Sequence, residues 1–403
     1  FTHLTGRWKD LFNARFEVLL YDLTSTYFES DPPFPEEDKR RYGYSRDKRS
    51  DCVQVVIALI VTPEGFPLAY EVLSGNTSDK ATLAGFLQKI QDQYGKAQRV
   101  WVMDRGIPTE KVLEQMRASD PPVQYLVGTP RGRLSQYEQK LIEVPWQIVR
   151  EGVSVKLLSE DSELYVLAQS RDRVHKERAM RRRQLKGLWQ RLKKLQAMKL
   201  KRDALLKKLG AALHTYPVAA RLLDPTVLPK EAKLTFTLCK DKLRQARKRE
   251  GRYLLRTNIT SGRTAEELWQ FYIQLTEVEA AFKNLKDDLA LRPIYHQLEH
   301  RIEAHIFLSF LAYCLHITLR RRLRDLALGL TARSVLGKFA TVQMLDVHLP
   351  TTDERTVILS RYTHPETDVQ LLLQQLKLEL PAQPPPKIIR PKLPDNLAAV
   401  VKT

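Results

Sequence analysis

Cysteine is scarce and shows no pattern in this chain of 403 residues, which has three cysteines. Cys52, Cys239 and Cys314 are isolated from one another, and no Cys-x-x-Cys or Cys/His ligand spacing occurs. This argues against a zinc site of the familiar spacings and against a disulfide framework. A cytoplasmic location, where thiols stay reduced, is therefore expected.

Long hydrophobic runs are also missing. The most apolar helical segment, residues 306–315, has ten residues and is flanked by His305 and His316. Because a membrane-spanning helix needs about 20 apolar residues, this segment is predicted to be a buried helix, and no membrane partner is expected. No signal peptide is visible at the start. Since the chain begins with Phe1 and not Met, we expect a further N-terminal segment to precede it.

Acidic residues are too few to balance the basic ones. The chain has 66 Lys and Arg against 47 Asp and Glu, a formal net charge of +19. A surplus of this size indicates a polyanionic partner, either nucleic acid or an anionic membrane surface.

Much of the surplus lies in one segment. Residues 171–208 hold 16 Lys and Arg against 3 Asp and Glu. Their helical pattern places Leu185, Leu188, Leu192 and Leu195 at the spacing of an apolar seam. One interpretation is a solvated helical arm. The other is a grip on the DNA backbone or a clamp on a second subunit.

Apolar periodicity before residue 130 predicts the order β-β-β-α-β-α-β. The strands are expected at 16–21, 52–62, 66–73, 99–103 and 124–127, and the helices at 78–94 and 109–116. Hairpin-connected strands followed by helix-connected ones predict an α/β fold, a mixed sheet with helices packed on it.

The rest of the chain is predicted to divide into further segments. We expect residues 1–130 to form the first part of a core, 131–258 an insertion, 259–330 the second part of the core, and 331–403 a C-terminal region. The insertion is expected to be largely β, with strands from 141–149 onward and a long basic helix at 174–209. Helices are predicted at 264–289 and 299–326. The proline-rich tail at 381–394 is predicted to be an extended linker.

Asp22 and Asp104 each follow an apolar, β-branched run. Asp is a common turn residue, so either one alone would favour a turn. If the first and fourth strands are neighbours, however, the two carboxylates lie together and repel each other unless a cation sits between them. Thr24, Arg105 and Gly106 beside them fit an open strand end.

A third carboxylate is predicted on the helix at 264–289. Its apolar stripe consists of Phe271, Leu275, Val278, Phe282, Leu285 and Leu289. Glu279 falls at the edge of this stripe, with Tyr272 and Lys286 one heptad to either side, whereas Glu277 and Asp288 point to solvent. A solvated rim is the alternative interpretation of Glu279 and Lys286.

Three carboxylates suit hard divalent cations. We expect Asp22, Asp104 and Glu279 to converge to within a few ångströms and to hold two such ions, an arrangement that cleaves phosphodiesters. The aromatic residues near this helix, Tyr253, Trp269 and Phe271, could stack on an unpaired base, although a place in the core is favoured.

The spacing Tyr272-x2-Leu275-x3-Glu279-x6-Lys286 resembles the Y-R-E-K signature of the DDE transposases of bacterial insertion sequences. YDLTSTYF and VMDRGI resemble the family's two Asp segments, and the resemblance extends over residues 16–326. Leu275 stands where the signature has Arg, which removes one expected phosphate contact. Leu275 also fits the apolar stripe.

The resemblance implies an RNase H-like core interrupted by a largely β insertion. It implies that Asp22, Asp104 and Glu279 are the catalytic residues and bind two Mg²⁺ ions, for which Mn²⁺ can substitute. One ion would activate a water or a 3′-hydroxyl and the other would stabilise the leaving oxygen. Tyr272, Lys286 and Arg105 would contact phosphates.

The implied activity is cleavage of the ends of an insertion sequence and their joining to target DNA. The implied partners are double-stranded DNA, both transposon ends and target, and a second copy of the chain. The alternatives are an RNase H-like nuclease that never joins and an inactive DNA-binding remnant.

Overall fold

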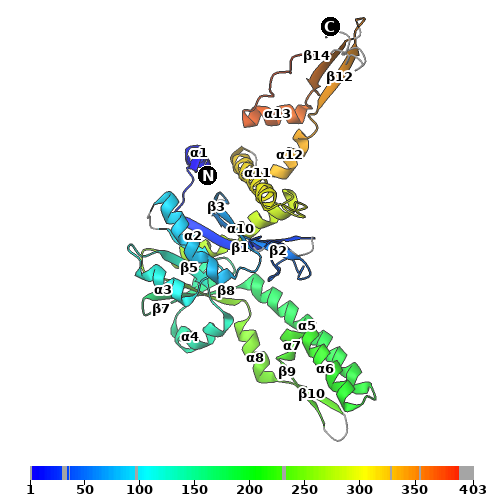
Figure 1. Ribbon diagram of the computed structural model, residues 1–403. Helices are drawn as coiled ribbons and strands as arrows, with labels where there is room; N and C mark the ends of the chain where they lie inside the picture. The colour runs from blue at the N-terminus through cyan, green and yellow to red at the C-terminus, as the bar shows by residue number, and fades with distance from the viewer. Residues whose placement is uncertain are drawn as a thin grey trace. The chain divides into compact units, whose positions relative to one another are not determined.

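The computed structural model describes residues 2–29, 34–35, 37–95, 99–228, 233–326, 329–353 and 355–389. The chain forms two compact units. The first consists of Phe1–Lys283 and Arg292–Glu299, and the second of Asn284–Leu291 and His300–Thr403. Figure 1 labels the helices and strands.

The first unit is built on a nine-stranded mixed sheet with the order β3-β2-β1-β4-β5-β11-β8-β7-β6. Its strands are β1 (Val18–Phe28), β2 (Val53–Val61), β3 (Pro67–Ser74), β4 (Val100–Met103), β5 (Gln124–Gly128), β6 (Gln147–Arg150), β7 (Val153–Glu160), β8 (Glu163–Ser170) and β11 (Arg252–Thr257). Strands β1, β4 and β5 are parallel, and β1, β2 and β3 are antiparallel. The predicted mixed sheet with helices packed on it is confirmed.

Helices cover the early strands because these strands are apolar on both faces. All nine residues of β2 are buried. On one face, alternate residues of β1 (Leu19, Tyr21 and Leu23) pack with α2 (Asp79–Tyr94) and α3 (Glu110–Ala118). Three further helices flank these strands in sequence: α1 (Thr2–Phe12) precedes β1, and α9 (Ala265–Ile273) and α10 (Leu275–Lys283) follow β11. Helix α10 packs on β1 and β2.

From β1 to β5 the predicted order β-β-β-α-β-α-β is confirmed, with one marked change of boundary, whereas helix α1 before it was not predicted. Strand β1 continues to Phe28, well past the predicted end at residue 21, because β2 pairs with it from Leu20 to Phe28. Asp22 therefore lies inside a strand and does not end it.

The segment 131–258 differs from the largely β insertion that was expected. It contains α4 (Arg131–Glu143), where a strand was predicted to begin at 141, and also α5 (Arg171–Ala197), α6 (Arg202–Thr215), α7 (Pro217–Ala220) and α8 (Lys240–Arg249). Helix α4 forms because Leu134 and Leu141, one heptad apart, pack together against β8 and β11. Strands β6, β7, β8 and β11 add to the core sheet, so this part is not a separate sheet.

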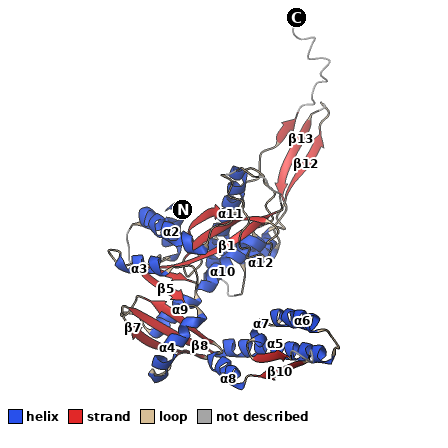
Figure 2. Ribbon diagram, turned by 60° about the horizontal axis from the view of Figure 1, so that its bottom comes forward, coloured by secondary structure: helices blue, strands red, loops and turns tan. Residues whose placement is uncertain are grey.

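A helical arm leaves this sheet (Figures 1 and 2). The leucine seam of α5 packs against α6, α7 and the hairpin of β9 (Leu223–Val227) and β10 (Leu234–Leu238), and Leu188 and Leu192 have no exposed surface. Gly187 lets the ring of Tyr216 approach α5, because a Cβ at this position would lie 2.6 Å from the nearest ring carbon.

We expect Gly187→Ala to destabilise the arm by about 1–3 kcal/mol, because the added methyl overpacks this contact. Gly210→Ala in α6 is the control, since a Cβ there meets nothing within 4 Å. The control is expected to stabilise its helix by about 0.5–1 kcal/mol. Hydrogen exchange of the α5 and α6 amides measures both effects, and equal protection in the two variants would contradict the prediction.

The second unit contains a π-helical turn, η1 (Asn284–Asp288), three helices and a small sheet. The helices are α11 (Glu299–Leu326), α12 (Ala332–Phe339) and α13 (Thr367–Leu376), and the strands are β12 (Met344–Pro350), β13 (Thr356–Tyr362) and β14 (Lys387–Ile389). Its core joins α11, α12 and α13 through Leu323, Val335 and Leu372. Strand β14 pairs with β13 within the segment predicted to be an extended linker. The end of that segment, from residue 390, lies outside the described residues.

Helix α11 has the 28 residues predicted for it. It is the one helix in the described part of the chain whose length and composition would allow it to cross a membrane, and 44% of its most apolar window is buried within the structure. Core helices pass the same test of length and composition.

The two compact units do not coincide with the four segments predicted from the sequence. Segment 131–258 groups with 1–130, whereas α11 groups with the C-terminal region from His300 onward.

Candidate active site

Sheet register brings Asp22 and Asp104 to the same level of the sheet. Strands β1 and β4 pair in parallel from Val18↔Val100 to Tyr21↔Met103. Asp22 is the next residue of β1, and Asp104 directly follows the end of β4. The predicted neighbourhood of the first and fourth strands is therefore confirmed.

The alternation of β1 directs Asp22 toward α10. Leu19, Tyr21 and Leu23 face α2 and α3, so Asp22 points to the opposite face of the sheet. Helix α10, which carries Glu279, packs on β1.

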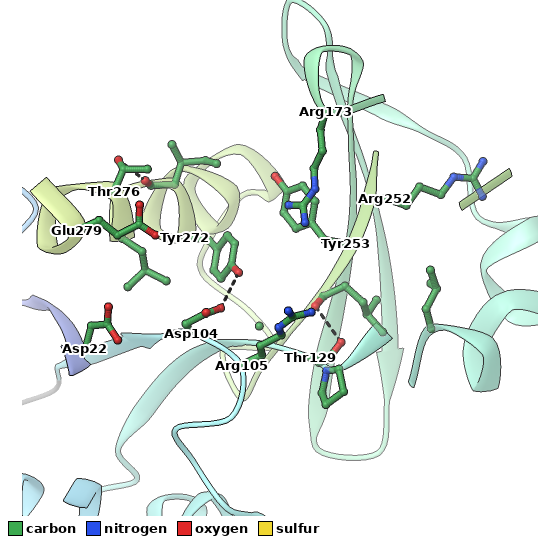
Figure 3. Close-up of a pocket in the computed structure, with 16 residues that line it drawn as sticks. Asp22, Asp104, Arg105, Thr129, Arg173, Arg252, Tyr253, Tyr272, Thr276 and Glu279 are labelled. Carbon is green, nitrogen blue, oxygen red and sulfur yellow. Dashed lines mark hydrogen bonds between the residues drawn. The ribbon is translucent and has the colours of Figure 1, made fainter. Parts of the chain in front are cut away.

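The three carboxylates line one cavity of about 380 Å³. The cavity is also lined by three arginines (Arg105, Arg173 and Arg252), two tyrosines (Tyr253 and Tyr272), Thr129 and Leu275. In Figure 3 the carboxylates lie toward the left of the view, Arg105 lies near the middle beside Asp104, and Arg173 and Arg252 lie toward the right. One side of the cavity thus offers oxygen ligands for cations, and the other offers cations for phosphates.

The expected close convergence of the carboxylates is met only in part. Among the described residues, no three His, Cys, Asp or Glu side chains are near enough to one another to form a ready metal site. Asp22, Asp104 and Glu279 share a cavity but not a closed cluster. The oxygen chemistry of the three fits a hard divalent cation, and their spacing requires them to draw together around it.

Asp22 is the carboxylate most affected by its surroundings. Its pKa is raised to about 7, chiefly by burial and to a smaller extent by the charges of Asp104 and Glu279. The backbone N–H of Leu23, 2.8 Å from Oδ1, and the guanidinium of Arg46 act in the opposite direction. A cation beside Asp22 would relieve this cost of holding a buried charge.

We expect the metal-free chain to lose stability as the pH rises from about 4 to about 7. In this window folded Asp22 keeps a proton that the unfolded chain releases, so the unfolded state binds fewer protons and is favoured as the pH rises. Urea unfolding in EDTA at several pH values measures the effect. Asp22→Asn should lack this contribution, and an identical pH dependence in both chains would contradict the prediction.

Tyr272 is held against the second Asp. Its hydroxyl donates to Asp104 Oδ1 at 3.4 Å (Figure 3), and burial raises the pKa of the phenol, with a further contribution from Asp104. The contact needs a glycine on β5, because a Cβ at Gly128 would lie 2.9 Å from the Tyr272 hydroxyl. The Tyr272 ring stacks on Tyr253, with centroids 5.8 Å apart.

Several cavity residues were not identified from the sequence. Arg173 lies in the first turn of α5, with its guanidinium 4.8 Å from the centre of the Tyr253 ring, and Arg252 is the first residue of β11. Gly128 could have been found, because it ends the strand beside β4 at the edge where Asp104 lies. Nothing in the local pattern of Arg173 or Arg252 distinguishes them from the many other basic residues of 131–258.

The aromatic candidates divide between the cavity and the core. Tyr253 lines the cavity, whereas Trp269 is buried and donates its indole N–H to the Tyr253 hydroxyl at 2.8 Å. Phe271 is half-buried, with the guanidinium of Arg263 5.5 Å from its ring.

The signature residues were predicted to share one continuous α-helix, and this prediction is wrong. Tyr272 lies in α9, Glu279 in α10 and Lys286 in η1, with a break at Gln274 and a π-helical turn from Asn284. The prediction that Tyr272 and Lys286 lie on the same helix face as Glu279, one heptad to either side, therefore does not hold outside α10. Tyr272 and Glu279 nevertheless meet at one cavity. Lys286 belongs to the second unit, and its phosphate contact stays a prediction.

Within α10 the expectation that Glu277 points to solvent is wrong, because its side chain is half-buried. Glu279 is exposed and lines the cavity, whereas Glu277 is not among the lining residues. Leu275, at the position of the signature Arg, is buried, with 9% of its surface exposed, and it also lines the cavity. It therefore belongs to the apolar stripe of the helix.

Comparison with known proteins gives one strong similarity. The family model described as "Transposase DDE domain" matches residues 14–315, more than half of the chain, and this range includes all the candidate site residues. No curated protein matches the chain. A similar solved chain is the piggyBac transposase in a synaptic complex with hairpin DNA, at 8% identity and a TM-score of 0.38. The similarity covers 78% of this chain and 51% of that one, so this chain spans about half of that length. By its family match, the chain belongs to the DDE transposases.

Proposed function

We propose that this chain cuts the ends of an insertion sequence and joins them to target DNA by metal-dependent phosphodiester chemistry. The observation that carries the proposal is the shared cavity of Asp22, Asp104 and Glu279 in a chain that matches the transposase family. These three side chains would hold two Mg²⁺ or Mn²⁺ ions. Bound there, the ions would lower the pKa of a water or a 3′-hydroxyl and offset charge on the leaving oxygen.

The chain's own residues would position the DNA. Arg105 lies next to Asp104 in the cavity lining and would pair with the phosphate that is cut. Tyr272 donates to Asp104 and would hold that carboxylate in orientation. Lys286 is proposed as a further phosphate contact. The partners proposed are double-stranded DNA, as transposon end and target, and a second copy of the chain, acting in the cytoplasm.

The test is a strand-transfer assay with the full chain, Mg²⁺ and plasmid DNA. The labelled duplex carries the inverted repeat that flanks the coding sequence and ends in a free 3′-hydroxyl. Joining of the label to the plasmid supports the proposal. Nicking without joining would indicate a nuclease, and a mobility shift alone would indicate an inactive DNA-binding protein; either result overturns the proposal.

A further inference from the structure

The outer face of α5 is a line of cations that the candidate active site does not include. At about 100° per residue, Lys176, Arg183, Lys186, Lys193 and Lys194 lie within about 60° of the direction opposite the leucine seam. All five are exposed. Among the described residues, none of the five forms an ion pair; the pairs of α5 use Arg171, Arg173, Arg178 and Arg181.

Helix α5 starts at the candidate active site. Arg173, in its first turn, lines the cavity with the three carboxylates. The whole helix has 27 residues, which corresponds to a length of about 40 Å. Figures 1 and 2 both show it leading away from the sheet within the arm.

The base of α5 is fixed to the strand that lines the same cavity. Buried Glu250 accepts hydrogen bonds from Arg181 at 2.5 Å and from Arg178 at 3.5 Å. Glu177 accepts from the backbone N–H of Gly251 at 2.9 Å. A Cβ at Gly251 would lie 2.3 Å from Val174, so the turn into β11 presses directly on α5. The cation line therefore has a set direction from the cavity.

We propose that this outer face of α5 binds the sugar-phosphate backbone of the duplex DNA that leads out of the active site. From Lys176 to Lys194 the helix rises about 27 Å, which matches about eight base pairs at 3.4 Å each. The proposal rests on the proposed function, which brings DNA to the cavity.

Charge favours DNA over a second subunit as the occupant. A second copy of this chain carries the same net charge of +19, so it would be repelled by a face of five unpaired cations. Duplex DNA carries about one negative charge per 1.7 Å of its axis and releases counterions when cations replace them.

The test compares two lysine pairs on the same arm. Lys193→Gln/Lys194→Gln removes two charges from the outer face of α5. The matched control, Lys207→Gln/Lys208→Gln, removes two exposed charges from α6. The probe is a fluorescein-labelled duplex of 30 base pairs and arbitrary sequence, and its binding to the full chain in EDTA is followed by anisotropy from 50 to 300 mM KCl.

The α5 pair is expected to reduce the slope of log K against log [KCl] by about 1 to 2, because each lost phosphate contact contributes about 0.9. The α6 pair is expected to leave the slope unchanged. An unchanged slope in the α5 variant, an equal loss in both variants, or no duplex binding by the parent chain would overturn the proposal.

The strand-transfer assay separates this inference from the proposed function. A parent chain that joins DNA while the α5 pair keeps the parent salt slope would overturn the α5 surface alone. A parent chain that neither cuts nor joins, with a reduced slope in the α5 pair, would overturn the proposed function and leave the surface standing.

Discussion

Asp104→Asn is expected to lower the rate of strand cleavage by about 10³-fold in Mg²⁺. The asparagine keeps an oxygen that accepts the hydrogen bond of Tyr272, so the local geometry survives while the charge is lost. A bound cation stabilises the transition state by several kcal/mol, and each 1.36 kcal/mol is tenfold in rate. Single-turnover cleavage of a labelled transposon-end duplex measures the effect.

A second readout does not depend on activity. Mg²⁺ should raise the unfolding midpoint of the parent chain, because a ligand that binds the folded state stabilises it, and Asp104→Asn should reduce this shift. Asp92→Asn in α2 is the control, since Asp92 is exposed and is in contact with Gln88, not with the cavity. If Asp104→Asn cleaves at the full parent rate, the assignment of Asp104 as a metal ligand is wrong.

Glu279→Gln is expected to cause a loss of similar size, about 10³-fold, whereas Glu277→Gln should stay close to the parent rate. The two changes are chemically identical and lie two residues apart on α10. Only Glu279 lines the cavity, because residues two apart on a helix point about 200° apart.

Thermal unfolding of both variants accompanies the cleavage assay, so that a folding defect is not mistaken for a lost ligand. If Glu277→Gln abolishes cleavage and Glu279→Gln does not, the assignment of the third carboxylate is wrong. If both variants lose only a little activity and to the same extent, Glu279 is not the third carboxylate of the site.

The order of strands and helices before residue 130 was predictable because its apolar pattern is strong. The run at β2 is apolar throughout and is buried throughout, and the turn at residues 63–65 separates it from β3 as expected. The adjacency of Asp22 and Asp104 followed from that order, since hairpin-linked strands and a helix-linked fourth strand favour β1 beside β4.

The helix of the signature shows where periodicity reaches its limit. An apolar repeat from Phe271 to Leu289 fits one long helix, but the chain breaks at Gln274 and widens into a π-helix from Asn284. A residue count along an ideal helix cannot foresee such changes, because tertiary packing, such as that of α10 on β1 and β2, can override a local pattern.

The sequence by itself determined which side chains are proposed to carry the chemistry: two Asp after apolar runs, a Glu at the edge of an amphipathic helix, and a basic segment with a leucine seam. The tertiary structure decided what surrounds them. Sheet pairing between segments more than a hundred residues apart placed β11 beside β5 and so brought Arg252 and Arg173 to the cavity of the carboxylates. Such pairing depends on the packing of whole faces, and no local spacing encodes it.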